Sequence, residues 1–425
     1  MKKNILFVIP WLPYPMKSGG HQALFNGIAA VKDDFNIYLT YEAWEGEEYR
    51  NTEEGFLQKI PQAQLLPLVR SINLNTKAPL PIRILRKVKK IVYGLIYPHQ
   101  QKTFTDNKYK REQGWIRSIS PLAPDFIEHV HSICNKYKFE IIQVEMPWLI
   151  SMVFGLPKTA KKVYVHHELG FVRRELEIKN NPSAYTLTCK AFADLNEIAQ
   201  LNLYDTIITL SPIDTNKLKK TGVSVPIESS FAIIDSPANP EVATSNGKVL
   251  TFIGPDNHSP NFIGITWFLE NCWGKLKDYD KEYRLNIIGK WSDMHTQEIK
   301  EKYADISFLG FVPDLNSAIK GTIMIVPITI GSGIRMKILE ACSKGVPFVS
   351  TTVGAEGIPV ENGKNCFITD NPSQFIEYII KLQDSNLQKS FIINAHKMVE
   401  KNYSLVALRQ NREAIYDTLL NPISI

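Results

Sequence analysis

The residues best suited to chemistry lie between Ile328 and Gly345, where the sequence reads ITIGSGIRMKILEACSKG. An apolar stretch leads into a glycine-rich turn, and a helical pattern follows the turn directly. Gly331, Ser332 and Gly333 leave the backbone amides at the start of that helix unobstructed, and a helix N-terminus favours an anion. The segment therefore predicts a binding site for a diphosphate group.

Charged side chains in the first turns of this helix support the same prediction. Arg335 and Lys337 stand where the helix dipole alone would favour acids, so their placement indicates an anionic ligand. Glu340, three residues after Lys337, is expected to accept hydrogen bonds from sugar or ribose hydroxyls. The alternative interpretation is a surface helix with a glycine-rich turn and an internal Lys–Glu pair.

A second glycine turn lies near the N-terminus, in the segment PMKSGGH from Pro15 to His21. Gly19 and Gly20 let the backbone approach a ligand closely, and the following helix directs its amides toward that ligand. Strand-to-helix turns often contain glycine without binding anything, so this turn is weak evidence by itself. The sequence holds no GxGxxG and no GxxxxGK followed by Ser or Thr, which argues against NAD and P-loop nucleotides.

Further acceptor-side or catalytic residues lie at or after the ends of two predicted strands. The segment VYVHHELGFVRR ends a strand with His166 and His167, and the carboxyl ends of parallel strands face the ligand crevice. A neutral imidazole can hydrogen-bond a sugar hydroxyl, although a structural histidine with satisfied bonds is the alternative. Arg173 would meet an anionic donor or acceptor, or solvent. Glu145, at the end of the preceding strand, is predicted to be an acceptor-side base.

The triplet Asp278, Tyr279 and Asp280 has the DxD spacing that some transferases use to bind a divalent metal. It lies in a charged run, KLKDYDKEY, between a predicted helix and a predicted strand. We therefore interpret it as a loop. Because no His/Cys cluster has metal-ligand spacing either, we predict no metal and no other cofactor.

Three stretches of the sequence resemble the retaining glycosyltransferases of family 4, which have the GT-B architecture. They are Gly19-Gly20, the run FIGPDNHSPN from Phe252 to Asn261, and the run GSGIRMKILEACSKGVPFVSTTVGAEGI, which ends at Ile358. The likeness in architecture covers nearly the whole chain. It implies a sugar transferase that uses a nucleotide-activated donor.

The resemblance also implies roles for particular residues. Glu340 matches the second Glu of the family's E-x7-E motif, which binds the donor ribose. Gly254 and Asn261 belong to the implied donor site, together with the glycines of both turns. His167, with His166 beside it, matches a histidine that contacts the transferred sugar.

Two positions depart from the family's pattern. Ser332 replaces the first Glu of E-x7-E, eight residues before Glu340. Many members carry an Arg and a Lys shortly after the glycine that matches Gly254, and this chain has neither. Arg335 and Lys337 are predicted to compensate. The residues that stand after Gly254 instead are Asp256, Asn257, His258 and Asn261.

Short stretches rich in Ile, Val and Phe alternate with segments of helical period, which predicts parallel sheets wrapped by helices. In the first half, strands are expected at 4–9, 35–41, 64–69, 139–145, 162–167 and 206–211. In the second half, they are expected at 249–254, 284–289, 306–310, 323–327, 347–350 and 365–369. Helices are expected at 261–275, at 334–344 and in three stretches after residue 372.

We therefore predict an α/β protein of GT-B architecture, with two Rossmann-like doubly wound domains facing a central cleft. A chain of 425 residues exceeds what one hydrophobic core ordinarily supports. The predicted N-terminal acceptor-binding domain spans 1–235 and the C-terminal nucleotide-sugar-binding domain spans 248–425. A turn-rich linker, 236–247, joins them, and the last helix can cross back to the first domain.

Composition excludes several classes of protein. The content of 44% hydrophobic and 22% charged residues is ordinary for a globular protein, and no apolar run reaches the roughly 18 residues of a membrane span. Proline interrupts the apolar N-terminus, which therefore is predicted to be a buried strand and not a secretion signal. Five scattered cysteines fit neither a disulfide framework nor a zinc site. We expect a cytoplasmic protein with no nucleic-acid partner.

Positive charge is concentrated in the first half of the chain. Residues 1–235 carry a net charge of +7 and the remainder a net charge of −1. The stretch from Pro79 to Ser120 alone holds ten basic and two acidic residues, and its apolar residues recur at helical spacing. This basic amphipathic pattern, centred on 80–117, predicts contact with an anionic membrane surface or a lipid-linked acceptor. A core-covering helix with solvated lysines is the alternative.

The predicted function is transfer of a sugar, with retention, from a nucleotide-diphosphate donor to a hydroxyl of a glycan or lipid-linked saccharide, as in polysaccharide biosynthesis. The resemblance implies front-face displacement, in which the departing diphosphate helps deprotonate the acceptor. Two alternatives stay open. One is a nucleotide-sugar epimerase of the same fold, and the other is a non-catalytic nucleotide-sugar binding protein, which would explain Ser332.

Overall fold

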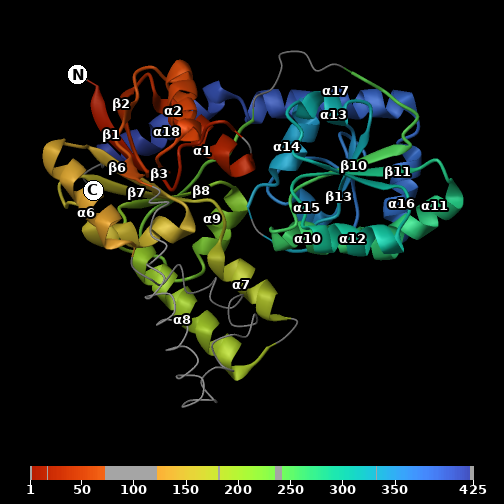
Figure 1. Cartoon of the computed structure of the whole chain (residues 1–425), viewed down its shortest axis with the longest axis horizontal. Coiled ribbons are helices and arrows are strands. Elements are labelled where there is room, and N and C mark those ends of the chain that lie inside the picture. Colours follow the sequence, from red (N-terminus) through yellow and green to blue (C-terminus); the bar gives the residue numbers. More distant parts are fainter. Residues whose placement is uncertain are drawn as a thin grey trace, which may run out of the picture. The chain divides into compact units, whose positions relative to one another are not determined.

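The computed structural model describes residues 2–16, 18–71, 122–179, 182–234, 242–331 and 333–421. Within this part of the chain, two parallel β-sheets carry the architecture (Figure 1). The order of the first sheet is β4-β2-β1-β6-β7-β8-β9 and that of the second is β12-β11-β10-β13-β14-β15. Both orders run outward in two directions from the first strand of each sheet, as in doubly wound folds.

The strands of the first sheet are short, and the central ones are buried. Ile5 to Val8 of β1 have no exposed surface, which explains why the sequence is apolar at consecutive positions and does not alternate. β1 pairs in parallel with β2 and β6. The strands are β1 (Lys3–Val8), β2 (Phe35–Thr40), β4 (Gln64–Leu65), β6 (Ile141–Glu145), β7 (Lys161–His166), β8 (Thr206–Thr209) and β9 (Ile227–Ser229).

The predicted strand at 64–69 is wrong in one respect, because two strands occupy it. β4 ends at Leu65, and β5 (Leu68–Arg70) leaves the first sheet to pair with β3 (Glu42–Trp44). Pro67 lies between them and has no backbone N–H to give to a sheet ladder. The proline therefore separates β4 from β5, although the apolar pattern continues through both strands.

Helices of the first half connect these strands, and several begin at a serine cap. The Ser183 side chain accepts from the Thr186 amide at the start of α8, and the Ser211 side chain accepts from the Asp214 amide at the start of α9. The helices are α1 (Gly19–Val31), α2 (Glu47–Lys59), α6 (Pro124–Lys136), η2 (Pro147–Gly155), α7 (Gly170–Lys179), α8 (Ala184–Leu201) and α9 (Pro212–Leu218).

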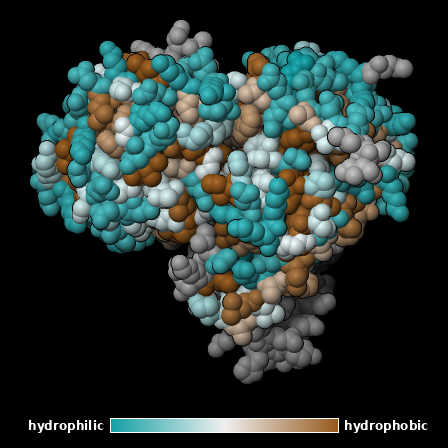
Figure 2. Space-filling model, turned by 180° about the vertical axis from the view of Figure 1, so that it is seen from behind, coloured by the Kyte–Doolittle hydropathy of each residue, from teal (hydrophilic) through white to brown (hydrophobic). Residues whose placement is uncertain are grey.

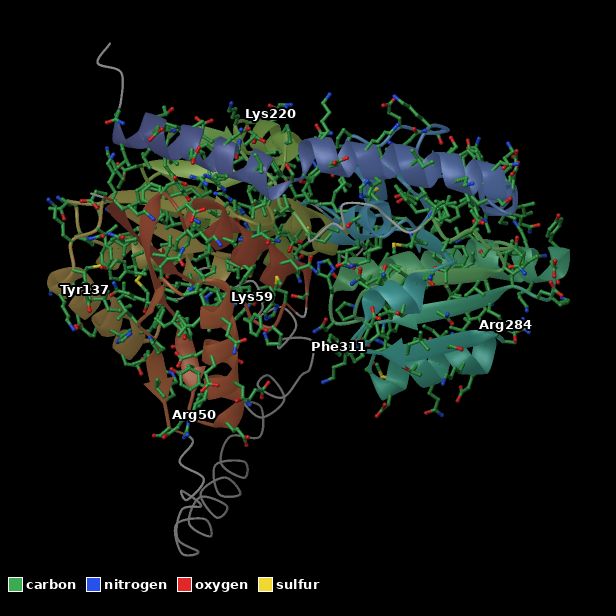
Figure 3. The ribbon with its side chains drawn as sticks, turned by 90° about the horizontal axis from the view of Figure 1, so that it is seen from above. Arg50, Lys59, Tyr137, Lys220, Arg284 and Phe311 are labelled. Carbon is green, nitrogen blue, oxygen red and sulfur yellow. The ribbon has the colours of Figure 1, made fainter. Side chains whose placement is uncertain are left out.

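The second sheet has the strand order of a Rossmann fold, with its topological switch point between β10 and β13. Figure 3 shows Arg284, which begins β11, and Phe311, which follows β12, at opposite ends of this sheet, as parallel strands require. The strands are β10 (Val249–Ile253), β11 (Arg284–Ile288), β12 (Ile306–Gly310), β13 (Ile323–Val326), β14 (Phe348–Ser350) and β15 (Phe367–Ile368).

Helices cover both faces of the second sheet. Figure 1 shows α13, α14 and α17 on one face and α10 and α12 on the other. The predicted helix at 261–275 consists of α10, the π-helical turn η3 and α11. The helices are α10 (Ser259–Phe268), η3 (Leu269–Trp273), α11 (Gly274–Tyr279), α12 (Asp293–Lys302), α13 (Leu315–Ile319), α14 (Met336–Ser343), α15 (Thr352–Ala355), α16 (Pro372–Lys381), α17 (Ser385–Asn402) and α18 (Leu405–Leu420).

The chain forms two compact units that do not follow chain order. The first unit comprises 1–12, 35–165 and 177–205, and the second comprises 13–34, 166–176 and 206–425. Within the second unit, α18 packs against α1, and Arg409 pairs with Asp33 and Asp34 at 3.3 and 2.7 Å. The domain boundary at 235 stays a prediction, and residues 236–241 of the predicted linker lie outside the described residues.

On the face that Figure 2 shows, hydrophilic residues predominate and hydrophobic patches lie between them. Several large apolar side chains of α8 are exposed, among them Phe192 and Leu195. Over the described ranges, no helix is both long enough and apolar enough to span a bilayer. The basic segment 80–117 lies outside the described residues.

Candidate functional site

The loop after β10 forms one side of the candidate site. Gly254 has φ 148°, and a Cβ there would lie 2.5 Å from the Asn261 side-chain nitrogen, so the backbone requires glycine. Asn261 is buried in the first turns of α10 and donates through Nδ2 to the Pro255 carbonyl oxygen at 2.9 Å. This bond fixes the loop and the orientation of the asparagine amide.

The loop after β13 forms the other side and leads into α14. Gly331 and Gly333 have φ of 125° and 80°, and a Cβ on Gly333 would lie 3.0 Å from the His167 carbonyl oxygen. Arg335 is the N-cap residue of α14, which therefore begins two residues later than the predicted helix. The Arg335 guanidinium donates to the Gly333 carbonyl oxygen. Ser332 lies outside the described residues.

Basic side chains converge where the two loops meet. Lys337 Nζ donates to Asn261 Oδ1 at 2.7 Å and lies 4.3 Å above the ring of Phe252. Burial and repulsion from Arg335 lower the pKa of Lys337 to about 7. Desolvation and repulsion from Lys337, Arg173 and Arg335 lower the pKa of His258 as well.

This concentration of like charge is unfavourable by itself, and a bound anion would relieve the repulsion, so the cluster is suited to an anionic ligand. Acidic side chains balance part of it. Burial lowers the pKa of Arg335, and the nearby carboxylates of Glu356, Asp214 and Glu168 oppose that shift. The sequence offered no signal for Asp214 or Glu356, which follow separate strands.

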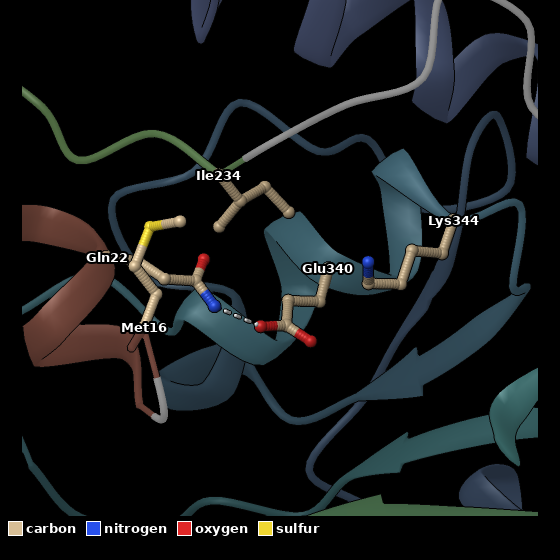
Figure 4. Close-up of a pocket in the computed structure, with 5 residues that line it drawn as sticks. All are labelled: Met16, Gln22, Ile234, Glu340 and Lys344. Carbon is tan, nitrogen blue, oxygen red and sulfur yellow. Dashed lines mark hydrogen bonds between the residues drawn. The ribbon is translucent and has the colours of Figure 1, made fainter. Parts of the chain in front are cut away.

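Glu340 faces a cavity of about 190 Å³, drawn in Figure 4. Its Oε1 accepts from Gln22 Nε2 at 2.9 Å, whereas its buried Oε2 has no hydrogen-bond partner among the described residues. Burial raises the pKa of the Glu340 carboxyl, and the bond from Gln22 opposes this only in part. The other lining residues are Met16, Ile234 and Lys344. The open acceptor suits a ligand hydroxyl.

The first glycine turn lies beside α14. Gly19 begins α1, and a Cβ on it would lie 2.7 Å from Met336 Cγ, so glycine permits the close approach that brings Gln22 to Glu340. Gly20 follows it in the first turn. Gln22 was not predicted as a site residue, although its position three residues after Gly19 places it on the same turn of helix.

The predicted histidines and Arg173 lie at the edge of the second unit's site. His166 is buried at the end of β7, and His167 follows it half-buried, with its carbonyl oxygen next to Gly333. Arg173 is exposed and lies 3.6 Å from Glu168. Glu145 belongs to the first unit, where it is buried and accepts from Gln143 at 2.6 Å. Its role on the acceptor side stays a prediction.

The DxD triplet forms ion pairs at the end of α11. Asp280 pairs with Lys248 and accepts from the Glu282 amide at 2.8 Å. Asp278 is exposed and lies 3.2 Å from Lys281. In the described part of the chain, no three His, Cys, Asp or Glu side chains are grouped as metal ligands would be. Independence from metals is still a prediction.

Comparison with known proteins identifies the class of fold. Residues 247–385 match the family model of the glycosyl transferases group 1. The chain has a GT-B fold, with parallel sheets in two Rossmann-like domains, as predicted. It is similar to TarM, with a TM-score of 0.70 and 13% identity over 99% of both chains. It is also similar to HepE of Anabaena, solved with UDP, with a TM-score of 0.61 and 14% identity over 98% of this chain and 100% of that one.

Two protein sequences are also similar. An uncharacterized 44.6 kDa protein in the cps region of Klebsiella pneumoniae is 20% identical, over 94% of this chain and 96% of that protein. The glycosyltransferase 1 domain-containing protein 1 of Xenopus tropicalis is 22% identical, over 32% of this chain and 42% of that protein. At such identities the structural likeness establishes the fold, and the activity has to be argued from the site.

Proposed function

We propose that the protein is a retaining glycosyltransferase that moves a sugar from a nucleoside-diphosphate donor to a hydroxyl of a glycan or lipid-linked saccharide. The observation that carries this proposal is the pairing, on one short helix, of a cation and a carboxylate with complementary tasks. Lys337 belongs to the basic cluster, and Glu340 holds an unpartnered oxygen in a cavity three residues further on.

The donor binds at two places along α14, with its diphosphate at the start of the helix and its ribose at Glu340. Its diphosphate binds Lys337, Arg335 and the amides at the start of α14, and its ribose hydroxyls donate to Glu340. Gly254, Gly331 and Gly333 keep side chains away from the phosphates. The cations matter most as the sugar leaves, because the bond from the sugar's anomeric carbon to the diphosphate breaks and negative charge grows on the leaving oxygens.

The acceptor hydroxyl attacks from the face that the diphosphate vacates, which retains the configuration of the sugar. The new bond joins the acceptor oxygen to the anomeric carbon, and the acceptor proton passes to a diphosphate oxygen. No protein carboxylate is required as nucleophile. His167 orients the sugar, with His166 behind it, while Arg173 and Glu145 serve the acceptor.

UDP is the first nucleotide to test. HepE was solved with UDP and with UDP-glucose, and a TarM variant was solved with UDP and α-GlcNAc-glycerol. The similar Klebsiella pneumoniae protein belongs to a cps region, which supports a role in polysaccharide biosynthesis. The basic segment 80–117 supports an acceptor at an anionic membrane surface.

The decisive experiment is a thermal-shift panel of UDP-, GDP-, ADP- and CMP-sugars, followed by incubation of the best donor without acceptor. Ligands that bind only the native state raise the melting temperature by mass action. Slow release of free sugar and nucleoside diphosphate is expected. Isomerised donor would indicate an epimerase instead, and the absence of any shift would contradict a nucleotide-sugar enzyme.

A further inference from the structure

Asn261 and Lys337 form a pair whose two members come from different helices of the second unit. Both polar atoms of the asparagine side chain are engaged, because its Oδ1 accepts from Lys337 at 2.7 Å and its Nδ2 donates to Pro255 at 2.9 Å. It keeps only 6% of its surface exposed. The side chain therefore presents little to a ligand, while Lys337 presents an ammonium group.

We propose that Asn261 is a positioning residue that does not touch the donor but fixes the Lys337 ammonium where the donor's diphosphate binds. This inference rests on the proposed function and assigns the Lys337 ammonium a fixed support. It replaces the donor-contacting role that the sequence predicts for Asn261.

The geometry explains why such a support is needed. A lysine side chain has considerable rotamer entropy to lose, and a ligand that must immobilise it binds more weakly. Asn261 and the face of Phe252 hold the ammonium before the donor arrives. An ammonium has three N–H donors, and Asn261 takes one, which leaves two for phosphate oxygens. The Asn261 amide is itself held, since its Nδ2 bonds the Pro255 carbonyl oxygen.

The charge state of Lys337 makes the binding of a diphosphate depend on pH. Because burial and Arg335 lower its pKa to about 7, part of the lysine is neutral at neutral pH in the absence of ligand. A bound diphosphate favours the protonated form, so binding takes up a proton above pH 7. The other basic groups facing it, Arg335 and His258, do not titrate between pH 7 and 9, because arginine stays protonated and the pKa of His258 is lowered from 6.5.

A double-mutant cycle tests the positioning role. UDP, GDP and ADP are titrated calorimetrically into the wild type, Asn261→Ala, Lys337→Ala and the double variant, between pH 7 and 9. Each single substitution is expected to weaken binding by roughly tenfold, the loss typical of one charge-assisted hydrogen bond. In the Lys337→Ala background, Asn261→Ala is expected to have almost no further effect, because its partner is gone.

Two further variants separate positioning from general damage to the loop. Asn271→Ala, which removes an asparagine that bonds Trp267 further along the same run of helix, is the matched control and is expected to leave binding unchanged. Asn261→Asp keeps the shape and sets a carboxylate against the ammonium, which raises the pKa of Lys337. The decline of affinity above pH 7 should then move to higher pH, and Lys337→Ala should abolish it.

The outcomes are distinguishable from failure of the proposed function. If the wild type binds none of the three nucleotides, both proposals fail together. If the wild type binds but Asn261→Ala weakens binding equally in both backgrounds, Asn261 contacts the donor itself and the positioning role is overturned. An unchanged pH profile in Asn261→Asp would overturn it too, because a merely structural asparagine would not move that profile.

Discussion

At the scale of single residues, Glu340 is the side chain whose role can be isolated most cleanly. Glu340→Gln keeps the shape and the first hydrogen bond but removes the charge. We expect it to weaken nucleotide-sugar binding by about 1–3 kcal/mol, as for other charge-assisted hydrogen bonds, while the fold survives. Titration of the donor, with circular dichroism as a check on folding, measures this. Unchanged affinity would remove Glu340 from the donor site.

The same variant has a predictable effect on stability. Because burial raises the pKa of Glu340 in the folded protein, its carboxyl binds protons more tightly folded than unfolded. Its contribution to the free energy of unfolding is therefore full at pH values below its ordinary pKa and is lost as the pH rises through the folded value. The difference in melting temperature between Glu340→Gln and the wild type should therefore shift in favour of the variant as the pH rises from 4 to 7.

Lys337 distinguishes ground-state binding from catalysis. Negative charge on the diphosphate grows as the sugar leaves, so a cation that follows it acts more strongly in the transition state. We expect Lys337→Ala to lower kcat by a larger factor than it raises KM. Steady-state kinetics with the identified donor and acceptor decide this. An effect on KM alone would mean that the lysine only holds the bound donor.

Part of the candidate site could be proposed from the sequence because its residues lie in one contiguous segment. Arg335, Lys337 and Glu340 follow a glycine turn within ten residues, so the local pattern was enough to group them. Gln22, Asp214 and Glu356 could not be predicted, since they reach the site through tertiary packing of three separate elements. The partnership of Asn261 with Lys337 spans 76 residues, and only coordinates reveal it.

At the scale of elements, buried parallel strands are the easiest to predict and their interruptions the hardest. Every strand of the second sheet falls within its predicted range, because each is apolar at consecutive positions. The segment 64–69 was predicted as one strand and forms two, because one proline within an apolar run changes which strands can pair. The start of α14 was placed too early, since the Gly331–Gly333 turn continues to Arg335 before helical hydrogen bonding begins.

The turn between β10 and α10 provides a prediction at this scale. Gly254→Ala would set a methyl group against Asn261 in a backbone conformation that alanine rarely adopts, so we expect a loss of about 1–3 kcal/mol in the free energy of unfolding. Gly274→Ala is the matched control, because this helical glycine has open space around it and should gain up to about 1 kcal/mol. Urea denaturation of both variants measures the difference. Equal stabilities would contradict the close packing at Gly254.

At the scale of the whole molecule, metal dependence is the property to test, because both carboxylates of the DxD triplet are already paired with lysines. Asp280 pairs with Lys248, and Asp278 with Lys281. We therefore expect turnover to survive prolonged treatment with EDTA, with the cations of the donor site doing the work of a metal. Loss of activity that Mn²⁺ or Mg²⁺ restores would contradict this, and Asp278 and Asp280 would then be the first residues to substitute.

The uneven distribution of charge provides the last prediction, which concerns where the protein works. The stretch from Pro79 to Ser120 lies outside the described residues, but its sequence carries ten basic and two acidic residues on a helical apolar pattern. Each basic residue near an anionic bilayer contributes about 1 kcal/mol, and salt screens the attraction. We therefore expect the protein to sediment with anionic but not neutral vesicles, and to be released at high salt.

Paired charge reversals decide whether that segment is responsible. Lys87→Glu with Lys90→Glu should weaken vesicle binding markedly, because both lysines lie within the basic stretch. Lys219→Glu with Lys220→Glu changes the net charge equally at two exposed lysines just after α9, where Figure 3 labels Lys220, and should have a much smaller effect. Equal losses in the two variants would show that total charge alone draws the protein to the vesicle. If the wild type binds neither type of vesicle, the membrane prediction is wrong. The alternative, a segment that covers the core and keeps its lysines in solvent, would then be favoured.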